Sequence, residues 1–136
     1  MTPRAAALAA AAAALLLAAL AIAQTHDTTA PTLTAYNLSP TTIDTYTSDV
    51  AIAITFTATD DLSGFREIAV CYTSPTNTQT TCTVGTASPL TLTMHQYAAA
   101  GDWKAAVHLT DNAGNQTEYS DAALATAGFN HTITVE

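Results

Sequence analysis

Apolar and polar residues alternate with a period of two along most of the chain after residue 31. The longest run is 50–59, where valine, isoleucine and phenylalanine alternate with alanine and threonine. Shorter runs follow the same period, at 32–38, 68–72, 80–86, 90–94, 103–109 and 133–135. Because successive side chains of a strand point to opposite faces, this pattern predicts about seven half-buried strands. Short strands separated by turn residues are typical of an all-β, two-sheet sandwich.

Only residues 120–127 (SDAALATA) have the character of a helix. Ser120 is a good N-cap residue and Gly128 a good stop, so we expect one or two helical turns before the last strand. Trp103 falls in phase with Val107 and Leu109. We therefore interpret it as a core residue, although an exposed tryptophan that stacks on sugars is the alternative.

The first 23 residues have the layout of a secretory signal peptide. Arg4 provides a basic start, residues 5–20 are apolar, and Ala21 and Ala23 form a small-x-small cleavage site. A transmembrane anchor is the alternative, because the apolar run is nearly long enough to span a bilayer. Alanine dominates the run and no basic cluster follows it, which favours cleavage. We therefore expect a leader at 24–30, a sandwich domain at 31–136, and a secreted or cell-surface location.

The composition is strongly acidic. The formal net charge is −8, and all eleven acids lie after residue 23, against only Arg66 and Lys104 in the same part of the chain. Such a chain has no basic surface for nucleic-acid phosphates and none for anionic lipids, so we expect neither nucleic-acid binding nor membrane insertion after signal cleavage. Cations are the ligands that its field attracts.

Cys71 and Cys82 are the only cysteines. In an exported chain an even pair predicts a disulfide, and the turn-forming residues between them place it at the base of a hairpin. The entropy of closing such a loop corresponds to about 3 kcal/mol of stability. A redox function would favour two-residue spacing between the cysteines.

No catalytic motif is present. The chain has no Gly-x-Ser-x-Gly nucleophile motif and no His-Glu-x-x-His zinc motif, and its four histidines lie on different segments. We therefore predict that the protein is not an enzyme.

Four segments carry a family resemblance: DTTAPTLTAYNLSPTTID (27–44), VAIAITFTATDDLSGF (50–65), YAAAGDWKAAVHLTDNAGN (97–115) and ALATAGFNHTITVE (123–136). Together they resemble the immunoglobulin-like β-sandwich modules of bacterial secreted and cell-surface proteins. Those modules often open with Asp-x-x-x-Pro, carry Asp-Asp-x-Ser-Gly after the second strand, and close the sixth strand with Asp-x-Ala-Gly-Asn. The resemblance implies this fold over the whole mature chain, and a structural, adhesion or accessory role. Cadherin-like modules, in which calcium stiffens a joint between domains, are also similar at this end.

Acidic residues accompany three of the predicted strand ends. Asp27 precedes the first strand, Asp60 and Asp61 follow the second, and Asp111 and Asn112 follow the sixth. In an immunoglobulin-like sandwich these ends meet at one pole, because neighbouring strands are antiparallel. Ca²⁺ takes six to eight oxygen ligands in flexible geometry, so these five residues are candidate calcium ligands. The alternative is that each motif is an ordinary turn, since Asp and Asn favour turns without any metal.

These observations favour a non-catalytic exported module that binds an unidentified protein or glycan at the cell surface, with Ca²⁺ as its candidate cofactor. A carbohydrate-binding module is the alternative, and it would need two or three exposed aromatic residues on one face. The candidates Tyr36, Tyr46, Tyr97 and Tyr119 lie on separate segments, and the question is whether Tyr97 and Tyr119 share an exposed face. A small secreted enzyme is a further alternative, which would need a pocket lined by titratable groups.

Overall fold

The computed structural model describes residues 26–136, so the predicted signal peptide (1–23) and the first two residues of the leader lie outside the described residues. Nine strands and one short helix make up the described chain: β1 (Thr32–Ser39), β2 (Thr42–Ile43), β3 (Val50–Thr59), β4 (Phe65–Thr73), β5 (Thr80–Gly85), β6 (Leu90–Met94), β7 (Gly101–Asp111), β8 (Gln116–Ser120), α2 (Asp121–Thr126) and β9 (Ile133–Val135).

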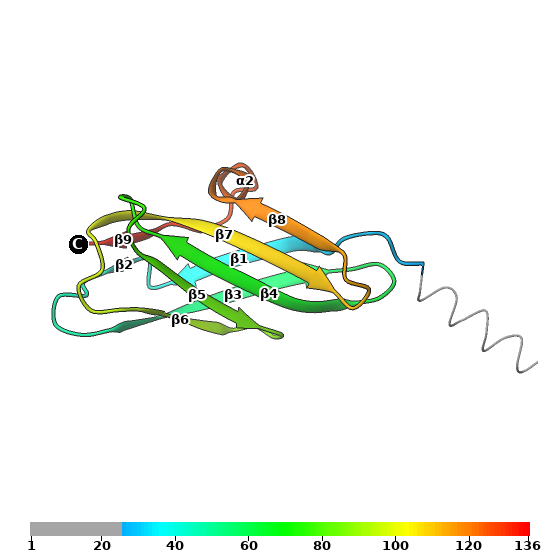
Figure 1. The fold of residues 1–136 in the computed structure, drawn as a ribbon, viewed down its shortest axis with the longest axis horizontal. Coiled ribbons are helices and arrows are strands. Elements are labelled where there is room, and N and C mark those ends of the chain that lie inside the picture. The colour runs from blue at the N-terminus through cyan, green and yellow to red at the C-terminus, as the bar shows by residue number, and fades with distance from the viewer. Residues whose placement is uncertain (1–25) are drawn as a thin grey trace, which may run out of the picture.

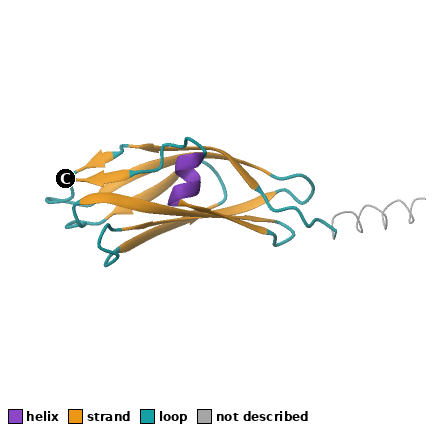
Figure 2. Ribbon diagram, turned by 90° about the horizontal axis from the view of Figure 1, so that it is seen from above, coloured by secondary structure: helices purple, strands orange, loops and turns teal. Residues whose placement is uncertain are grey.

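The strands form two sheets that face each other (Figures 1 and 2). The smaller sheet has the order β1-β3-β6, and the larger has the order β2-β9-β7-β4-β5, with β8 also paired to β7. All pairs are antiparallel except β2 with β9. The predicted all-β, two-sheet architecture is therefore confirmed.

The core lies between the sheets and is built by the alternation seen in the sequence. Ile52 and Ile54 of β3 face Val70 and Tyr72 of β4 and Val107 of β7 across the gap, and all five are fully buried. Trp103 is 3% exposed and donates its indole N–H to the Ala99 carbonyl at 2.9 Å. The interpretation of Trp103 as a core residue is confirmed.

All seven predicted strands are present, together with two short strands that were not predicted, β2 and β8. No strand was predicted between 103–109 and 133–135, but the turn at 111–115 leads into β8. β8 has no fully buried residue and β2 has only two residues, so neither produces an apolar alternation. β8 and β9 share one edge of β7, at residues 106–110 and 101–103 respectively.

The helix α2 lies where the sequence predicts it. The Ser120 hydroxyl accepts from the Ala123 N–H at 3.2 Å, and Gly128, with φ +75°, ends the helix. Leu124 is fully buried and anchors α2 to the core. Seen from above in Figure 2, α2 lies across the side of the sandwich between β8 and β9.

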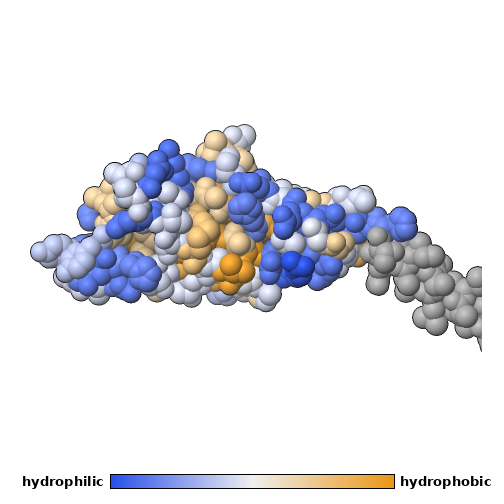
Figure 3. Space-filling model, viewed as in Figure 1, coloured by the Kyte–Doolittle hydropathy of each residue, from blue (hydrophilic) through white to orange (hydrophobic). Residues whose placement is uncertain are grey.

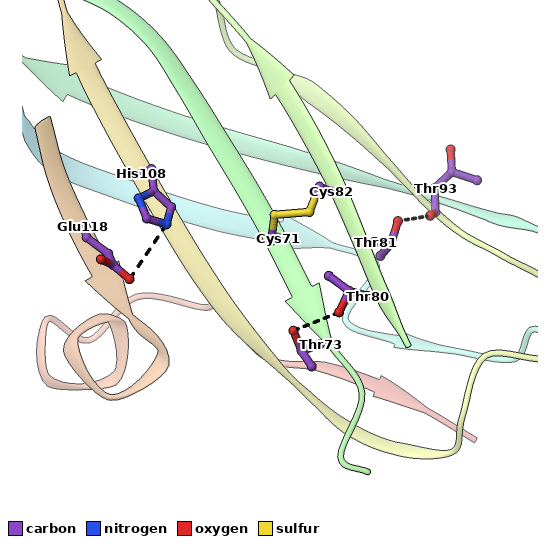
Figure 4. The surroundings of a disulfide bond; sticks show 8 residues. All are labelled: Cys71, Thr73, Thr80, Thr81, Cys82, Thr93, His108 and Glu118. Carbon is purple, nitrogen blue, oxygen red and sulfur yellow. Dashed lines mark hydrogen bonds and ion pairs between the residues drawn. A yellow bond between two sulfur atoms is a disulfide. The ribbon is translucent and has the colours of Figure 1, made fainter. Parts of the chain in front are cut away.

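The disulfide between Cys71 and Cys82 is confirmed. The two residues face each other across the β4–β5 pair with their Cα atoms 4.1 Å apart (Figure 4). Ala69, Val84 and Ala106 are their neighbours in register. These small side chains form an apolar area at the centre of the outer face of the larger sheet, which is visible in Figure 3.

Along residues 26–136 we find no helix with the length and apolar character needed to cross a membrane.

Two tyrosine hydroxyls lie inside the sandwich. Tyr36 on β1 and Tyr72 on β4 are 4% and 0% exposed, and their hydroxyl oxygens are 3.1 Å apart. Tyr72 also donates to the His131 carbonyl at 2.7 Å. Burial raises the pKa of Tyr36 to about 12, and the hydrogen bond with Tyr72 offsets only part of that rise. Burial raises the pKa of Tyr72 further still, and the neighbouring Tyr36 adds to the rise.

We expect this pair to make the domain sensitive to alkali. The folded pKa of Tyr36 lies above its ordinary value of 10.0, so the folded state holds the proton more tightly than the unfolded state. The stabilising effect of the protonated Tyr36 hydroxyl is complete below pH 10 and is lost as the pH rises toward 12. The shift of Tyr36 alone corresponds to roughly 3 kcal/mol of unfolding free energy. Urea denaturation at a series of pH values across this window measures the effect.

Tyr36→Phe is the control, because it keeps the ring and removes the titrating hydroxyl. Its unfolding free energy should fall less steeply than that of the wild type above pH 10. Equal slopes in the two proteins would contradict the assignment.

Candidate functional site

Three loops meet at the end of the sandwich that is farthest from the carboxyl terminus, at the right of Figure 1. They are the leader (26–31), the β3–β4 loop (60–64) and the β7–β8 turn (111–115), and we call this end the aspartate pole. They come together because β1 begins, β3 ends and β7 ends at the same side of the antiparallel sheets. The predicted convergence of these loops is therefore confirmed.

Each of the three loops contributes one carboxylate to a compact cluster. Asp27, Asp60 and Asp111 each offer an oxygen atom, and these three atoms all lie within 4.8 Å of one another. Asp111 is fully buried and Asp27 is 5% exposed, whereas Asp60 is partly exposed. We call these residues the aspartate triad. Burying carboxylates this close together is unfavourable unless hydrogen bonds or cations compensate their charge.

Asn115 is the main hydrogen-bond donor to Asp111. Its backbone N–H donates to Oδ1 and its side-chain amide to Oδ2, both at 2.8 Å. The same amide group donates to the carbonyl oxygens of Asp27 and Thr29, at 3.1 and 3.3 Å, and so ties the leader to the β7–β8 turn. Gly114 makes this turn possible, because its φ of +94° is one that other residues rarely adopt. The sequence analysis missed the function of Asn115, although the Asp-x-x-x-Asn spacing of the motif contained it.

Asp27 and Asp60 organise the β3–β4 loop. Asp27 accepts from the Thr29 N–H at 3.0 Å and from the Ser63 N–H at 2.9 Å. Asp60 accepts through Oδ2 from the Gly64 N–H at 2.7 Å and from the Ser63 hydroxyl at 3.3 Å. Its other oxygen, Oδ1, is buried and has no hydrogen-bond partner. A buried carboxylate oxygen without a donor is unusual, because the lost hydration is then not replaced.

The other two predicted ligands have different surroundings. Asp61 is exposed and does not belong to the triad. The side-chain amide of Asn112 donates to the carbonyls of Ser63 and Gly64, at 2.9 and 3.0 Å, so it joins two loops. Gly64 has φ +83°, and a Cβ atom there would lie 3.4 Å from the Asn112 amide nitrogen.

The hydrogen bonds keep two members of the triad ionised. The nearby Ser63 side chain lowers the pKa of Asp27, burial opposes it, and the N–H groups of Thr29 and Ser63 add to the lowering. Burial raises the pKa of Asp111, but the hydrogen bonds from Asn115, Gly114 and Ala113 together outweigh it, so that the net change is downward.

The arginine and lysine of the described chain do not pair with the aspartate triad. Arg66 is 3.4 Å from Glu67, and Lys104 lies in register with Thr73, at the other end of β7. The triad therefore presents clustered carboxylate oxygens without an arginine or lysine partner among the ion pairs of residues 26–136. Oxygen-only ligand sets of this kind suit hard cations, whereas zinc and copper favour nitrogen and sulfur.

The four candidate tyrosines have different surroundings. Tyr36 is buried, and Tyr119 packs partly buried against the core, where its hydroxyl accepts from the Leu33 N–H at 2.9 Å. Tyr97 lies in the β6–β7 loop at the opposite end of the sandwich, so it shares no exposed face with Tyr119. Its neighbour is Tyr46, and the two exposed rings pack edge to face with centroids 6.1 Å apart.

Comparison of the chain with protein-family models, with curated proteins and with solved structures finds no match.

We expect Asn115→Ala to lower the melting temperature by several degrees. The substitution removes the one side-chain donor that Asp111 Oδ2 has among residues 26–136, and both amide bonds to the leader, which leaves a buried carboxylate oxygen unsatisfied. Thermal unfolding followed by circular dichroism measures the change. Asn37→Ala is the matched control, because the same substitution there breaks an exposed bond to Asn130. Equal losses in the two variants would show that Asn115 has no special role.

Proposed function

We propose that the protein is an exported, non-catalytic module of the immunoglobulin-like class, and that its aspartate pole binds Ca²⁺. The module has a structural, adhesion or accessory binding function, and the rigid loops of this pole contact its partner. Loops on a rigid sandwich are the usual place for such contacts. The partner is a protein or glycan at the cell surface.

The strand connections support the immunoglobulin-like assignment. The chain passes from the smaller sheet to the larger between β3 and β4, returns between β5 and β6, and crosses again between β6 and β7. The first strand is also divided, because β1 pairs in the smaller sheet and β2 in the larger. Connections of this type characterise immunoglobulin-like sandwiches.

The observation that carries the calcium proposal is the aspartate triad with its unpartnered oxygen. Ca²⁺ lies 2.3–2.6 Å from its oxygen ligands, so two ligands of one ion can be up to about 5 Å apart. The separations within the triad, at most 4.8 Å, fit that limit. Asp60 Oδ1 is buried without a donor, as expected for an atom that needs a cation. Asp27 and Asp111 would supply the other carboxylate ligands.

Such an ion would compensate the charge of three carboxylates and brace three loops at once. Sites of extracellular modules bind calcium with dissociation constants of about 10⁻⁴ to 10⁻³ M. The proposed site therefore fits a protein that works outside the cell, where calcium is plentiful. The disulfide supports the same location, since it needs an oxidising compartment.

Export is tested by the mass of the mature chain. The proposal expects cleavage between Ala23 and Gln24, so that the secreted product begins at Gln24. Intact-mass analysis of the protein secreted by a suitable host measures this. A product that keeps residues 1–23 and stays in the membrane fraction would contradict export.

Calcium binding is tested by thermal unfolding of the secreted chain in calcium and in chelator. A ligand at a hundred times its dissociation constant stabilises the folded state by about 2.7 kcal/mol, which corresponds to several degrees in a domain of this size. We expect a shift of that order at millimolar calcium. Superimposed melting curves would overturn the calcium proposal.

Asp60→Asn separates a lost ion site from a damaged fold. The variant keeps an oxygen that can accept from Gly64 and removes one negative charge from the triad. In chelator it should melt at or above the wild-type temperature, because repulsion falls, and calcium should no longer raise that temperature. Asp44→Asn is the matched control: it removes one charge at the opposite pole, keeps an acceptor for Tyr46 N–H, and should retain the full calcium response.

A further inference from the structure

A second candidate site lies at the opposite end of the sandwich. There the β2–β3 loop (44–49), the β4–β5 loop (74–79) and the β6–β7 loop (95–100) meet, and we call this end the tyrosine pole. It contains a cavity of about 330 Å³. Small-molecule sites span about 300–1,000 Å³, so the cavity is at the lower end of that range.

The lining of this cavity combines apolar and polar side chains. Met94 and Trp103, which are almost fully buried, provide the apolar part. Gln79, His95 and Gln96 contribute amide and imidazole groups, and the threonines of β5 contribute hydroxyl groups. Such a lining suits a ligand that has both an apolar face and many hydroxyl groups.

Two exposed aromatic rings belong to loops of the same pole, although neither ring is part of the cavity lining. Tyr97 lies in the chain between the lining residues Gln96 and Ala98, and Tyr46 packs against it. Tyr46 is 74% exposed and Tyr97 is 66% exposed. Exposed tyrosines offer an apolar ring for stacking together with a hydroxyl group for hydrogen bonding.

The backbone of Tyr97 is strained. Its φ is +64°, in the left-handed region that bulky residues rarely adopt. The loop holds this conformation through two hydrogen bonds: the Tyr97 N–H donates to Thr45 O at 3.0 Å, and the Gln79 amide donates to Tyr97 O at 3.3 Å. Strain of this kind gathers at ligand-binding sites, because stability alone would favour glycine or asparagine at such a position.

Hydrogen bonds also fix the neighbouring loops before any ligand binds. The Gln96 amide donates to Tyr46 O at 3.1 Å, and the Gln79 side chain accepts from Ala99 N at 2.7 Å. Asp49 accepts from Gln96 N at 2.8 Å and lies 3.2 Å from the His95 ring. A site that is already ordered loses little conformational entropy on binding.

We propose that the tyrosine pole is a binding site for neutral oligosaccharides, with Tyr46 and Tyr97 as the stacking residues. A sugar ring has an apolar C–H face for the tyrosines and a rim of hydroxyl groups for the glutamine, histidine and threonine side chains. The formal net charge of −8 and the nearby Asp49 disfavour acidic sugars. The site is independent of the proposed calcium site, because the two lie at opposite ends of the sandwich.

Trp103 provides a direct measurement. It is the only tryptophan of the chain and lines the cavity, so its fluorescence reports on this site. We would titrate the mature protein with cellohexaose, laminarihexaose and chitohexaose, in calcium and in chelator, and confirm binding by calorimetry. We expect at least one of these neutral probes to change the emission with saturation at millimolar concentration or below, and hexagalacturonate to have no effect. The absence of saturable binding for all three neutral probes would overturn the proposal, as would binding of hexagalacturonate alone.

Tyr97→Gly is the decisive variant. Glycine adopts the left-handed backbone without strain, so the fold should not be damaged. The melting temperature of the variant should fall only by the small amount that corresponds to one lost exposed ring contact. Its affinity for the responding probe should fall at least tenfold, and Tyr46→Ala should also weaken binding. Val84→Ala, which truncates an exposed side chain on β5 outside the cavity lining, is the control and should bind normally. Unchanged affinity in Tyr97→Gly would overturn the assignment.

The same titration separates this proposal from the calcium proposal. Asp60→Asn should bind the responding oligosaccharide with wild-type affinity whether or not calcium stabilises the wild type. Loss of sugar binding in Asp60→Asn, with Tyr97→Gly unaffected, would place the sugar at the aspartate pole and overturn the assignment to the tyrosine pole.

Discussion

The carboxylate of Asp111 has no contact with water, and the organisation of one end of the molecule depends on that burial. A buried charge must be solvated by the protein itself, so donors have to be placed around it. Asn115 provides them from the same turn, which requires a left-handed glycine between the two residues. The amide of Asn115 then holds the leader. The leader in turn positions Asp27 to accept from Ser63, and the β3–β4 loop is fixed as a result. One desolvated group thus determines the conformation of three segments that are distant in sequence.

The two ends of the sandwich differ in chemistry because different constraints shape them. At the aspartate pole, carboxylates are concentrated, and their hydrogen bonds leave the pKa values of Asp27 and Asp111 below the ordinary value. At the tyrosine pole, the Gln79 and Gln96 amides and the Asp49 carboxylate brace loops that display aromatic rings. Strand β7 connects the two ends, and its eleven residues extend over roughly 35 Å. Under the two proposals, the rigid core between the poles would let each pole bind its own ligand without disturbing the other.

The sequence predicts the sheets well because burial alternates along most of the length of the long strands. Ile52, Ile54, Val107 and Leu109 are all fully buried, in the phase that the alternation indicates. It also predicts which loops share an end, since antiparallel pairing determines this. Features that depend on the backbone conformation of a loop, or on contacts between distant segments, cannot be predicted from the sequence. The exclusion of Asp61 from the triad follows from the course of the β3–β4 loop, and the pairing of Tyr46 with Tyr97 joins two loops that have no periodic pattern. β8 was missed because an edge strand without a fully buried residue resembles a loop in sequence.

The position of α2 has a consequence for how the molecule behaves among copies of itself. A chain rich in threonine is prone to intermolecular strand pairing wherever a long sheet edge is open. Here the edge opposite β5 consists of two short strands, β8 with five residues and β2 with two. β2 pairs with β9, and α2 lies between β8 and β9 in the chain. An incoming strand would lose its hydrogen-bonding partners after a few residues at that edge. The helix therefore limits intermolecular strand pairing on that side. Strand β5 remains the longer open edge of the larger sheet.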